Sequence, residues 1–263
     1  MTYIIAVANQ KGGVGKTTTS INLAASLAAT KRRVLLVDLD AQGNATMGVG
    51  VDKSALSKTC RDVLLEHARP GEVIQFLSGV GISLLPANSD MTEAEIKLRD
   101  VAAGDFALKS ALAEVAEQFD YVLIDCPPAL SKLTLNALVA ADGVLIPMQC
   151  EYYALEGLTA LMDTVNKIKR VINPRLEVDG LLRTMFDPRN NLATDVSDQL
   201  LQHFGDKVYR TIVPRNVRLA EAPSHGLPVM LYDAQSSGAK AYLALAGEVL
   251  RRHDGGQLRL SAA

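Results

Sequence analysis

The sequence predicts an α/β fold: a doubly wound, mostly parallel sheet with helices on both faces. Short apolar runs typical of buried strands alternate along the chain with longer segments of helical periodicity. No Pro/Gly/Ser-rich linker interrupts this alternation, and no internal repeat is present. Strands that alternate with helices run parallel, and the connecting helices pack on both faces of the sheet. We therefore expect one domain over residues 1–253, followed by a flexible tail at 254–263.

The composition is that of a globular chain. Of 263 residues, 48% are hydrophobic and 21% are charged, and the net charge is −2. No apolar run approaches the ~18 residues of a membrane-spanning helix, and the N-terminus lacks the layout of a signal peptide. The three cysteines are far apart and odd in number, which argues against a disulfide framework and a C-x-x-C metal site. We therefore expect a cytoplasmic protein.

The first strand, loop and helix predict a phosphate-binding unit. The apolar run 3–8 reads as a buried strand, glycines at 12–15 form a tight loop, and Thr17 opens a helix that reaches Ala29. Glycines let backbone N–H groups turn toward an anion, and a helix N-terminus adds partial positive charge. Lys16 is expected to reach the β- and γ-phosphates, and the Thr17 hydroxyl to hold Mg²⁺. The predicted cradle consists of Lys11, Gly12, Gly13, Val14, Gly15, Lys16, Thr17 and Thr18.

Two further apolar runs end in aspartates. Residues 34–37 lead to Asp38 and Asp40, and residues 121–124 lead to Asp125. Because the carboxyl ends of parallel strands meet at a ligand crevice, all three side chains are expected near the phosphates. Asp125 fits a Walker B carboxylate, which binds Mg²⁺ through water. A strand-end turn or a helix cap is the alternative for Asp38 and Asp40.

The remaining segments continue the alternation. Residues 41–46 are rich in turn formers and predict a loop. The arrangement of residues 46–105 stays open. Further helices are predicted in pieces across 54–78 and at 92–100, 106–119, 133–141, 152–171, 194–204 and 239–252, and further strands at 82–86, 143–147, 178–185 and 207–213.

Four stretches resemble the signatures of the ParA/MinD group of P-loop ATPases, in the order in which that group carries them. The first looks like the deviant Walker A motif, because Gln10 replaces the usual first glycine and Lys11 adds a second lysine. The fourth is most similar to the Soj branch, the chromosomal partition ATPases. The resemblance spans nearly the whole chain and implies a P-loop NTPase fold. The four stretches are 11–17, 37–44, 125–130 and 213–226.

The resemblance assigns roles that the residues alone do not. It implies that Lys11 reaches across a dimer to the partner's nucleotide, that Asp40 positions the attacking water, and that Asp38 supports the Mg²⁺ shell. The candidate catalytic residues are thus Lys11, Lys16 and Asp40, and the candidate metal residues are Thr17, Asp38 and Asp125.

A second set of residues is assigned to the adenine. By the same resemblance, Met185, Pro214 and Asn216 border the base. A proline offers a flat apolar wall and an exposed carbonyl, which suits a purine. Termination of a strand is the alternative for Pro214.

Arg189 and Arg218 match arginines with which the family binds DNA without sequence preference. Exposed guanidinium groups suit phosphate contacts, which add affinity but no sequence information. Residues 207–220 also carry four basic residues and no acidic one, although ordinary solvated arginines are the alternative. Because two monomers joined over ATP double the contacts, dimerisation would switch DNA affinity on.

The resemblance implies an Mg²⁺-dependent ATPase that forms an ATP-sandwich homodimer and binds nonspecific double-stranded DNA in its ATP form. With a ParB-like centromere-binding partner it would drive chromosome or plasmid segregation, associating with the nucleoid when ATP-bound and with no membrane. Three alternatives remain. A MinD-like membrane ATPase needs an amphipathic C-terminal helix, for which 255–263 is too short and too sparsely apolar. A reductase of the nitrogenase iron-protein type needs dimer-facing cysteines. An ATP-switched regulator of replication or transcription would use the same residues.

Overall fold

The sheet is mostly parallel, as predicted. The computed structural model describes residues 2–152 and 154–260, with only the backbone for 254–260. Across these residues the strands form one eight-stranded sheet in the order β3-β4-β2-β5-β1-β6-β7-β8. Each neighbouring pair is parallel except β3 and β4, which are antiparallel. The strands are β1 (Tyr3–Val7), β2 (Val34–Asp38), β3 (Gln75–Leu77), β4 (Ile82–Leu85), β5 (Tyr121–Asp125), β6 (Gly143–Gln149), β7 (Glu177–Phe186) and β8 (Val208–Pro214).

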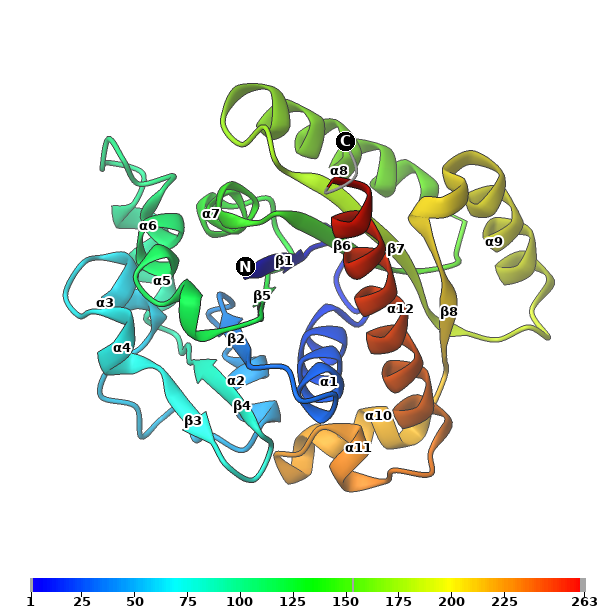
Figure 1. The fold of residues 1–263 in the computed structure, drawn as a ribbon, viewed down its shortest axis with the longest axis horizontal. Helices are drawn as coiled ribbons and strands as arrows, with labels where there is room; N and C mark the ends of the chain where they lie inside the picture. The colour runs from blue at the N-terminus through cyan, green and yellow to red at the C-terminus, as the bar shows by residue number, and fades with distance from the viewer. Residues whose placement is uncertain (1, 153, 261–263) are drawn as a thin grey trace.

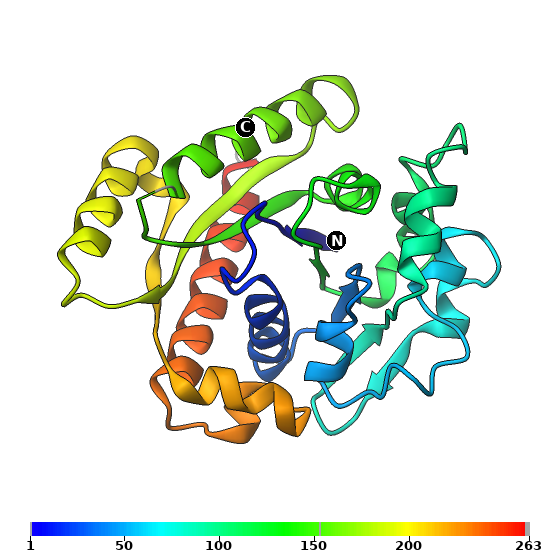
Figure 2. The ribbon, with the colours of Figure 1, turned by 180° about the vertical axis from the view of Figure 1, so that it is seen from behind.

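Helices connect the strands and cover the sheet. Figures 1 and 2, seen from opposite sides, both place α1 beside α12 and place β3 and β8 at the two ends of the sheet. Within the described residues, no helix is both long and apolar enough to span a bilayer. The α-helices are α1 (Lys16–Ala29), α2 (Asn44–Gly48), α3 (Cys60–Leu64), α4 (Pro70–Val73), α5 (Met91–Lys97), α6 (Ala107–Ala113), α7 (Lys132–Ala140), α8 (Ala154–Val171), α9 (Asn191–Phe204), α10 (Val217–Glu221), α11 (Val229–Tyr232) and α12 (Ser237–Leu260). Short 3₁₀ turns occupy Ala116–Gln118, Gly205–Lys207 and Ala222–His225.

The central strands face two hydrophobic cores. Successive strand residues point to opposite faces, so Ile5 and Val7 pack in one core and Ala6 in the other. The first core includes apolar residues of α1 and α12, and the second those of α7 and α8. Burial on both faces explains why these strands are nearly continuous apolar runs.

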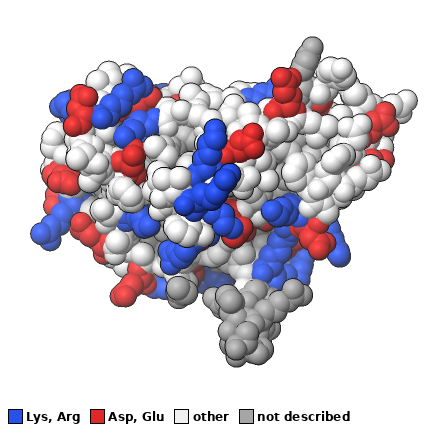
Figure 3. All heavy atoms as spheres, turned by 90° about the horizontal axis from the view of Figure 1, so that it is seen from above, with Lys and Arg blue, Asp and Glu red and all other residues white. Residues whose placement is uncertain are grey.

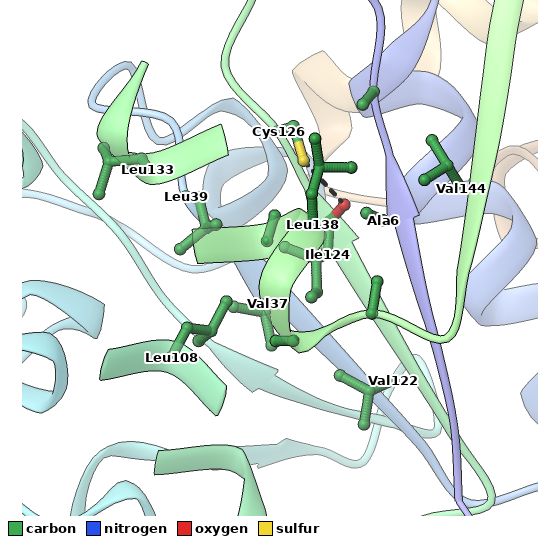
Figure 4. Packing of buried hydrophobic residues seen from close by; sticks show 14 of the residues in the cluster. Ala6, Val37, Leu39, Leu108, Val122, Ile124, Cys126, Leu133, Leu138 and Val144 are labelled. Carbon is green, nitrogen blue, oxygen red and sulfur yellow. Dashed lines mark hydrogen bonds between the residues drawn. The ribbon is translucent and has the colours of Figure 1, made fainter. Parts of the chain in front are cut away.

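The second core lies directly behind the aspartate-bearing ends of β2 and β5. Figure 4 shows Val37 and Ile124 of these strands among side chains of α6 and α7, with Leu138 close to Ile124. The Cys126 thiol contacts the Ile124 carbonyl at 3.8 Å in the same region. This packing holds the strand ends that carry Asp38 and Asp125.

The structure differs from the sequence prediction at β3. The stretch 54–78 was expected to be helical, but α4 ends at Val73, Ile74 is extended, and Gln75–Leu77 pairs with β4. A tight turn joins the two strands, and Gly81 adopts a φ of 80°, which favours glycine. A short apolar run fits a helix turn or a strand equally well, and the hairpin decides between them.

Two further segments differ from expectation. The predicted loop 41–46 contains the start of α2, because Gly43 takes a left-handed conformation at the helix N-cap. The last helix was expected to end at Arg252 but continues to Leu260. Glycines 255 and 256 lower helix propensity by about 1 kcal/mol each without forbidding the helical conformation. Of the predicted tail, residues 261–263 lie outside the described residues.

Candidate functional site

Strand register brings the predicted site residues to one edge of the sheet. Asp125, the last residue of β5, is paired with Val7 on one side and Asp38 on the other. The glycine loop follows β1 immediately and leads into α1. The loop, Asp38 and Asp125 therefore meet at the carboxyl end of the sheet, as predicted.

The loop has the backbone conformation of an anion cradle. Gly13 and Gly15 have φ values of 73° and 87°, a region that a side chain would strain. Gly15 is the N-cap of α1, so the first N–H groups of this helix point out of its N-terminus. The loop is tied to β7 by a hydrogen bond of 2.8 Å from the Thr184 hydroxyl to the Val14 carbonyl.

The two lysines of the loop occupy different environments. Lys16 is 7% exposed, its ammonium donates to the Lys11 carbonyl at 3.0 Å, and burial lowers its pKa. An ammonium has three donors, so Lys16 keeps donors for an anion. Lys11 is exposed and forms an ion pair with Glu151, just beyond β6.

Asp125 lies beneath the loop and contacts α1. It is fully buried, and it accepts hydrogen bonds of 2.8 Å from both the Thr17 and the Ser20 hydroxyls. Burial raises the pKa of Asp125, and the neighbouring Asp38 raises it further.

Asp38 is equally buried and is held by the loop that follows it. Its carboxylate accepts from the Asp40 amide at 3.1 Å and from the amide and hydroxyl of Thr46 at 2.8 Å each. Burial raises the pKa of Asp38, and the Thr46 hydrogen bonds oppose this rise. Asp40 itself is partly exposed, and its carboxylate accepts only from the Gln42 amide, at 3.0 Å, among the described residues.

These residues fit a divalent cation. Neither Asp38 nor Asp125 has an ion pair or hydrogen bond to a lysine or arginine in the described part of the chain. Two adjacent buried carboxylates without a cation are unfavourable, because like charges repel in a low-dielectric interior. Carboxylate and hydroxyl oxygens are the donors that Mg²⁺ prefers.

A cavity adjoins the cradle and brings the three predicted base-contacting residues together. It has a volume of about 340 Å³, and Met185, Pro214 and Asn216 line it with Gly15 and Thr18 of the cradle. Met185 has a φ of 49°, which is rare for a residue with a side chain. The Asn216 amide nitrogen donates to the Ser237 hydroxyl at 2.7 Å, whereas its buried Oδ1 has no partner among the described residues. The cavity thus has mostly apolar walls, and one residue that lines it, Asn216, carries a buried acceptor without a partner among the described residues.

The two predicted DNA-contacting arginines are both paired with carboxylates. Arg189 is 88% exposed and binds both Asp187 oxygens, at 2.7 and 2.9 Å. Arg218 contacts Glu221 at 2.8 Å and Asp233 at 3.3 Å. Figure 3 shows Lys and Arg gathered near the middle of one face with acidic side chains around them, so charge on this face is mixed.

Several residues of the site had no assigned role in the sequence analysis. Ser20 follows Thr17 by one helical turn, so helical spacing alone would have placed it beside Asp125. Glu151, which pairs with Lys11, and Tyr242, which lines the base cavity, come from distant elements, and no local pattern marks them or Thr46. The buried state of Cys60, Cys126 and Cys150 leaves no cysteine exposed for the iron-protein alternative.

Known proteins resemble this chain over nearly its full length. A family model described as an AAA domain matches residues 2–178. The chromosome-partitioning ATPase Soj of Thermus thermophilus is 52% identical over 250 residues, covering 94% of this chain and 95% of its own. The sporulation initiation inhibitor protein Soj of Bacillus subtilis is 50% identical over 249 residues, covering 95% and 98%.

A solved structure shares the fold. It is described as cobyrinic acid a,c-diamide synthase of Mycobacterium smegmatis with bound ATP analog and magnesium, and it is 38% identical with a TM-score of 0.86. The match covers 97% of each chain. The cradle motif, the sheet and these similarities lead to one conclusion: the chain belongs to the ParA/Soj family of chromosome-partitioning ATPases, within the P-loop proteins that carry this AAA domain.

Proposed function

We propose that the chain is an Mg²⁺-dependent ATPase that dimerises over ATP, binds DNA without sequence preference and releases it on hydrolysis to ADP and phosphate. Working with a ParB-like partner, it would segregate a chromosome or plasmid. One observation carries the ATPase assignment: the buried Asp38 and Asp125 lie side by side next to Thr17 and Lys16, at the mouth of a glycine loop.

Four residues of the site, Lys16, Thr17, Asp40 and Asp125, have tasks in this reaction. The Lys16 ammonium turns from the Lys11 carbonyl to the phosphates, where its charge stabilises the transition state. Thr17 and Asp125 would hold Mg²⁺, which when bound neutralises charge on the phosphate oxygens. Asp40 orients the attacking water from the partly exposed loop after β2.

The base cavity supports adenine as the ligand. The apolar walls suit a purine face, and the unused Asn216 Oδ1 suits the exocyclic amino group of adenine, which is a donor. The ATP analog and magnesium bound to the Mycobacterium smegmatis structure support the same choice.

Dimerisation requires Lys11 to change partners. Its ion pair with Glu151 involves half-exposed side chains, and such pairs contribute about 0–1 kcal/mol. The pair is therefore weak enough for Lys11 to leave Glu151 and bind a phosphate across a dimer.

DNA binding requires a similar exchange. The carboxylate partners of Arg189 and Arg218 are surface groups, so a DNA phosphate can displace them at small cost. Few contacts in a monomer would give weak binding, and doubling them in a dimer raises affinity steeply.

Regulation of transcription or replication by the same switch is a second candidate. It is favoured by the name of the Bacillus subtilis relative, a sporulation initiation inhibitor protein. Both functions use ATP-gated dimerisation and DNA binding, so they differ in the partner and the DNA target.

Phosphate release from ATP with and without Mg²⁺ tests the enzymatic part. Lys16→Ala should abolish hydrolysis, whereas Lys31→Ala, an exposed lysine at the other end of α1, should leave it unchanged. Hydrolysis retained by Lys16→Ala would refute the cradle assignment.

A further inference from the structure

We infer that Thr46 is a positioning residue for ATP hydrolysis: its amide and hydroxyl fix Asp38, and through Asp38 they fix the loop that carries Asp40. This inference rests on the proposed function, because it takes Asp40 to orient the attacking water. It explains how the partly exposed Asp40 is held in place by the buried atoms of Asp38 and Thr46.

The contacts form a closed clasp around the loop. The Thr46 amide and hydroxyl both donate to Asp38 Oδ2 at 2.8 Å, and the Asp40 amide donates to Asp38 Oδ1 at 3.1 Å. Both ends of the segment 40–46 are therefore tied to one carboxylate. The clasp fixes the backbone of Asp40, while its carboxylate, which accepts only from the Gln42 amide among the described residues, keeps the capacity to bind water.

The clasp is anchored to the neighbouring strand. The Thr46 hydroxyl accepts from the Ala87 amide at 2.9 Å, just beyond the end of β4, and both residues are fully buried. Gly43 packs against the same segment so tightly that a Cβ there would lie 2.7 Å from the Ala87 carbonyl. The loop therefore has a fixed position relative to the sheet.

The single hydroxyl of Thr46 takes part in two hydrogen bonds. It donates its proton to Asp38 and accepts from Ala87, so its loss leaves a buried amide without a partner and a carboxylate with one donor fewer. Valine has nearly the same shape without the hydroxyl, and serine keeps the hydroxyl. Substitution by each separates hydrogen bonding from packing.

The chain contains a matched control at the far end of the sheet. The amide and hydroxyl of Thr211 in β8 both donate to one carboxylate oxygen of the buried Glu248, at 2.9 and 2.8 Å. Thr211→Val thus removes the same kind of contact from a carboxylate far from Asp40 along the sheet order. It reports what the loss of a carboxylate-bound threonine hydroxyl does to stability at a partly exposed position, away from the site.

The test is steady-state ATP hydrolysis by the full-length variants, with melting temperature and affinity for fluorescent ADP measured in parallel. Thr46→Val should lower kcat roughly 10- to 100-fold, the range for a misplaced catalytic group, with KM for ATP and ADP affinity within about 2-fold. Thr46→Ser should recover kcat to within about 3-fold, and Thr211→Val should leave it within the same limit. Amide exchange in 39–46 should be faster only in Thr46→Val.

Other results would overturn the inference. These are a kcat for Thr46→Val equal to that of Thr211→Val, a rise in KM with kcat intact, or failure of Thr46→Ser to recover activity. Thr46→Ala is prepared alongside, and failure of both the valine and alanine variants to fold would show a general structural role instead. If the wild-type protein itself hydrolyses no ATP, the proposed function fails. If the wild-type protein hydrolyses ATP and Thr46→Val has the same kcat, only this inference fails.

Discussion

Asp125→Asn should stabilise the ligand-free protein while removing its response to Mg²⁺. Asp125 is fully buried beside Asp38, and among the described residues neither carboxylate forms an ion pair or hydrogen bond with a lysine or arginine, although the Lys16 ammonium lies close enough for Asp125 to raise its pKa. Asparagine has the same shape and keeps an oxygen for the Thr17 or Ser20 hydroxyl. The substitution therefore removes a buried charge without opening a cavity.

The expected gain follows from the cost of burying an unpaired charge. After the two hydroxyl hydrogen bonds are counted, we expect Asp125→Asn to raise the free energy of unfolding by about 1–3 kcal/mol. This is the penalty of an uncompensated buried polar group. For a chain of this size, each kcal/mol raises the melting temperature by about 2–4 °C. Active-site groups often store such strain.

The effect should depend on pH in one direction. Because burial raises the pKa of Asp125 above its unfolded value, the folded state binds its proton more tightly. The destabilisation is therefore present above the folded pKa and is relieved as pH falls through it. The advantage of Asp125→Asn should be largest at pH 8 and should shrink toward pH 5.

Thermal unfolding at both pH values, with and without ADP and Mg²⁺, measures these effects. Asp120→Asn is the control, because Asp120 is paired with Arg33 and that pairing lowers its pKa. This control should lower stability slightly or leave it unchanged. A lower melting temperature for ligand-free Asp125→Asn at pH 8, or an undiminished stabilisation by Mg²⁺ and ADP, would refute the reasoning.

Three further predictions concern binding. Arg189→Glu and Arg218→Glu should each weaken DNA binding in a gel shift and make the binding less dependent on salt, while ATP-dependent dimerisation persists. Loss of both DNA binding and dimerisation would assign these arginines to the dimer. Asn216→Leu should raise KM for ATP roughly 10-fold with kcat nearly unchanged, because the base contact is uniform binding, and a fall in kcat alone would contradict this. Glu151→Gln should free Lys11 and raise the dimer fraction in ATP by light scattering, whereas a lower dimer fraction would show that Glu151 serves the dimer.

The fold was predictable where local patterns are unambiguous. The strands β1, β2 and β5 are continuous apolar runs, and the glycine loop and terminal aspartates mark their carboxyl ends. β3 was not predictable, since its three residues pair only because a turn brings them to β4. The course of α12 beyond Arg252 was also missed, because glycine weakens a helix without ending it.

The site was predictable as a set of chemical groups but not as a network. Lys16, Thr17 and Asp125 follow from a motif in which spacing sets geometry. The contacts of Thr46 with Ala87 and of Lys11 with Glu151 join residues 41 and 140 positions apart. Such contacts depend on how elements pack, which one sequence does not reveal.

The central claim is that ATP switches nonspecific DNA binding on. The most direct measurement is a gel shift of Asp40→Ala, a variant expected to bind ATP without hydrolysing it, on an arbitrary DNA duplex. It is run with ATP, with ADP and without nucleotide, at two salt concentrations. Binding only with ATP, weakened by the higher salt, is the predicted result, because the proposed contacts are to DNA phosphates. Equal binding in all three nucleotide states, or none in any of them, would contradict the claim.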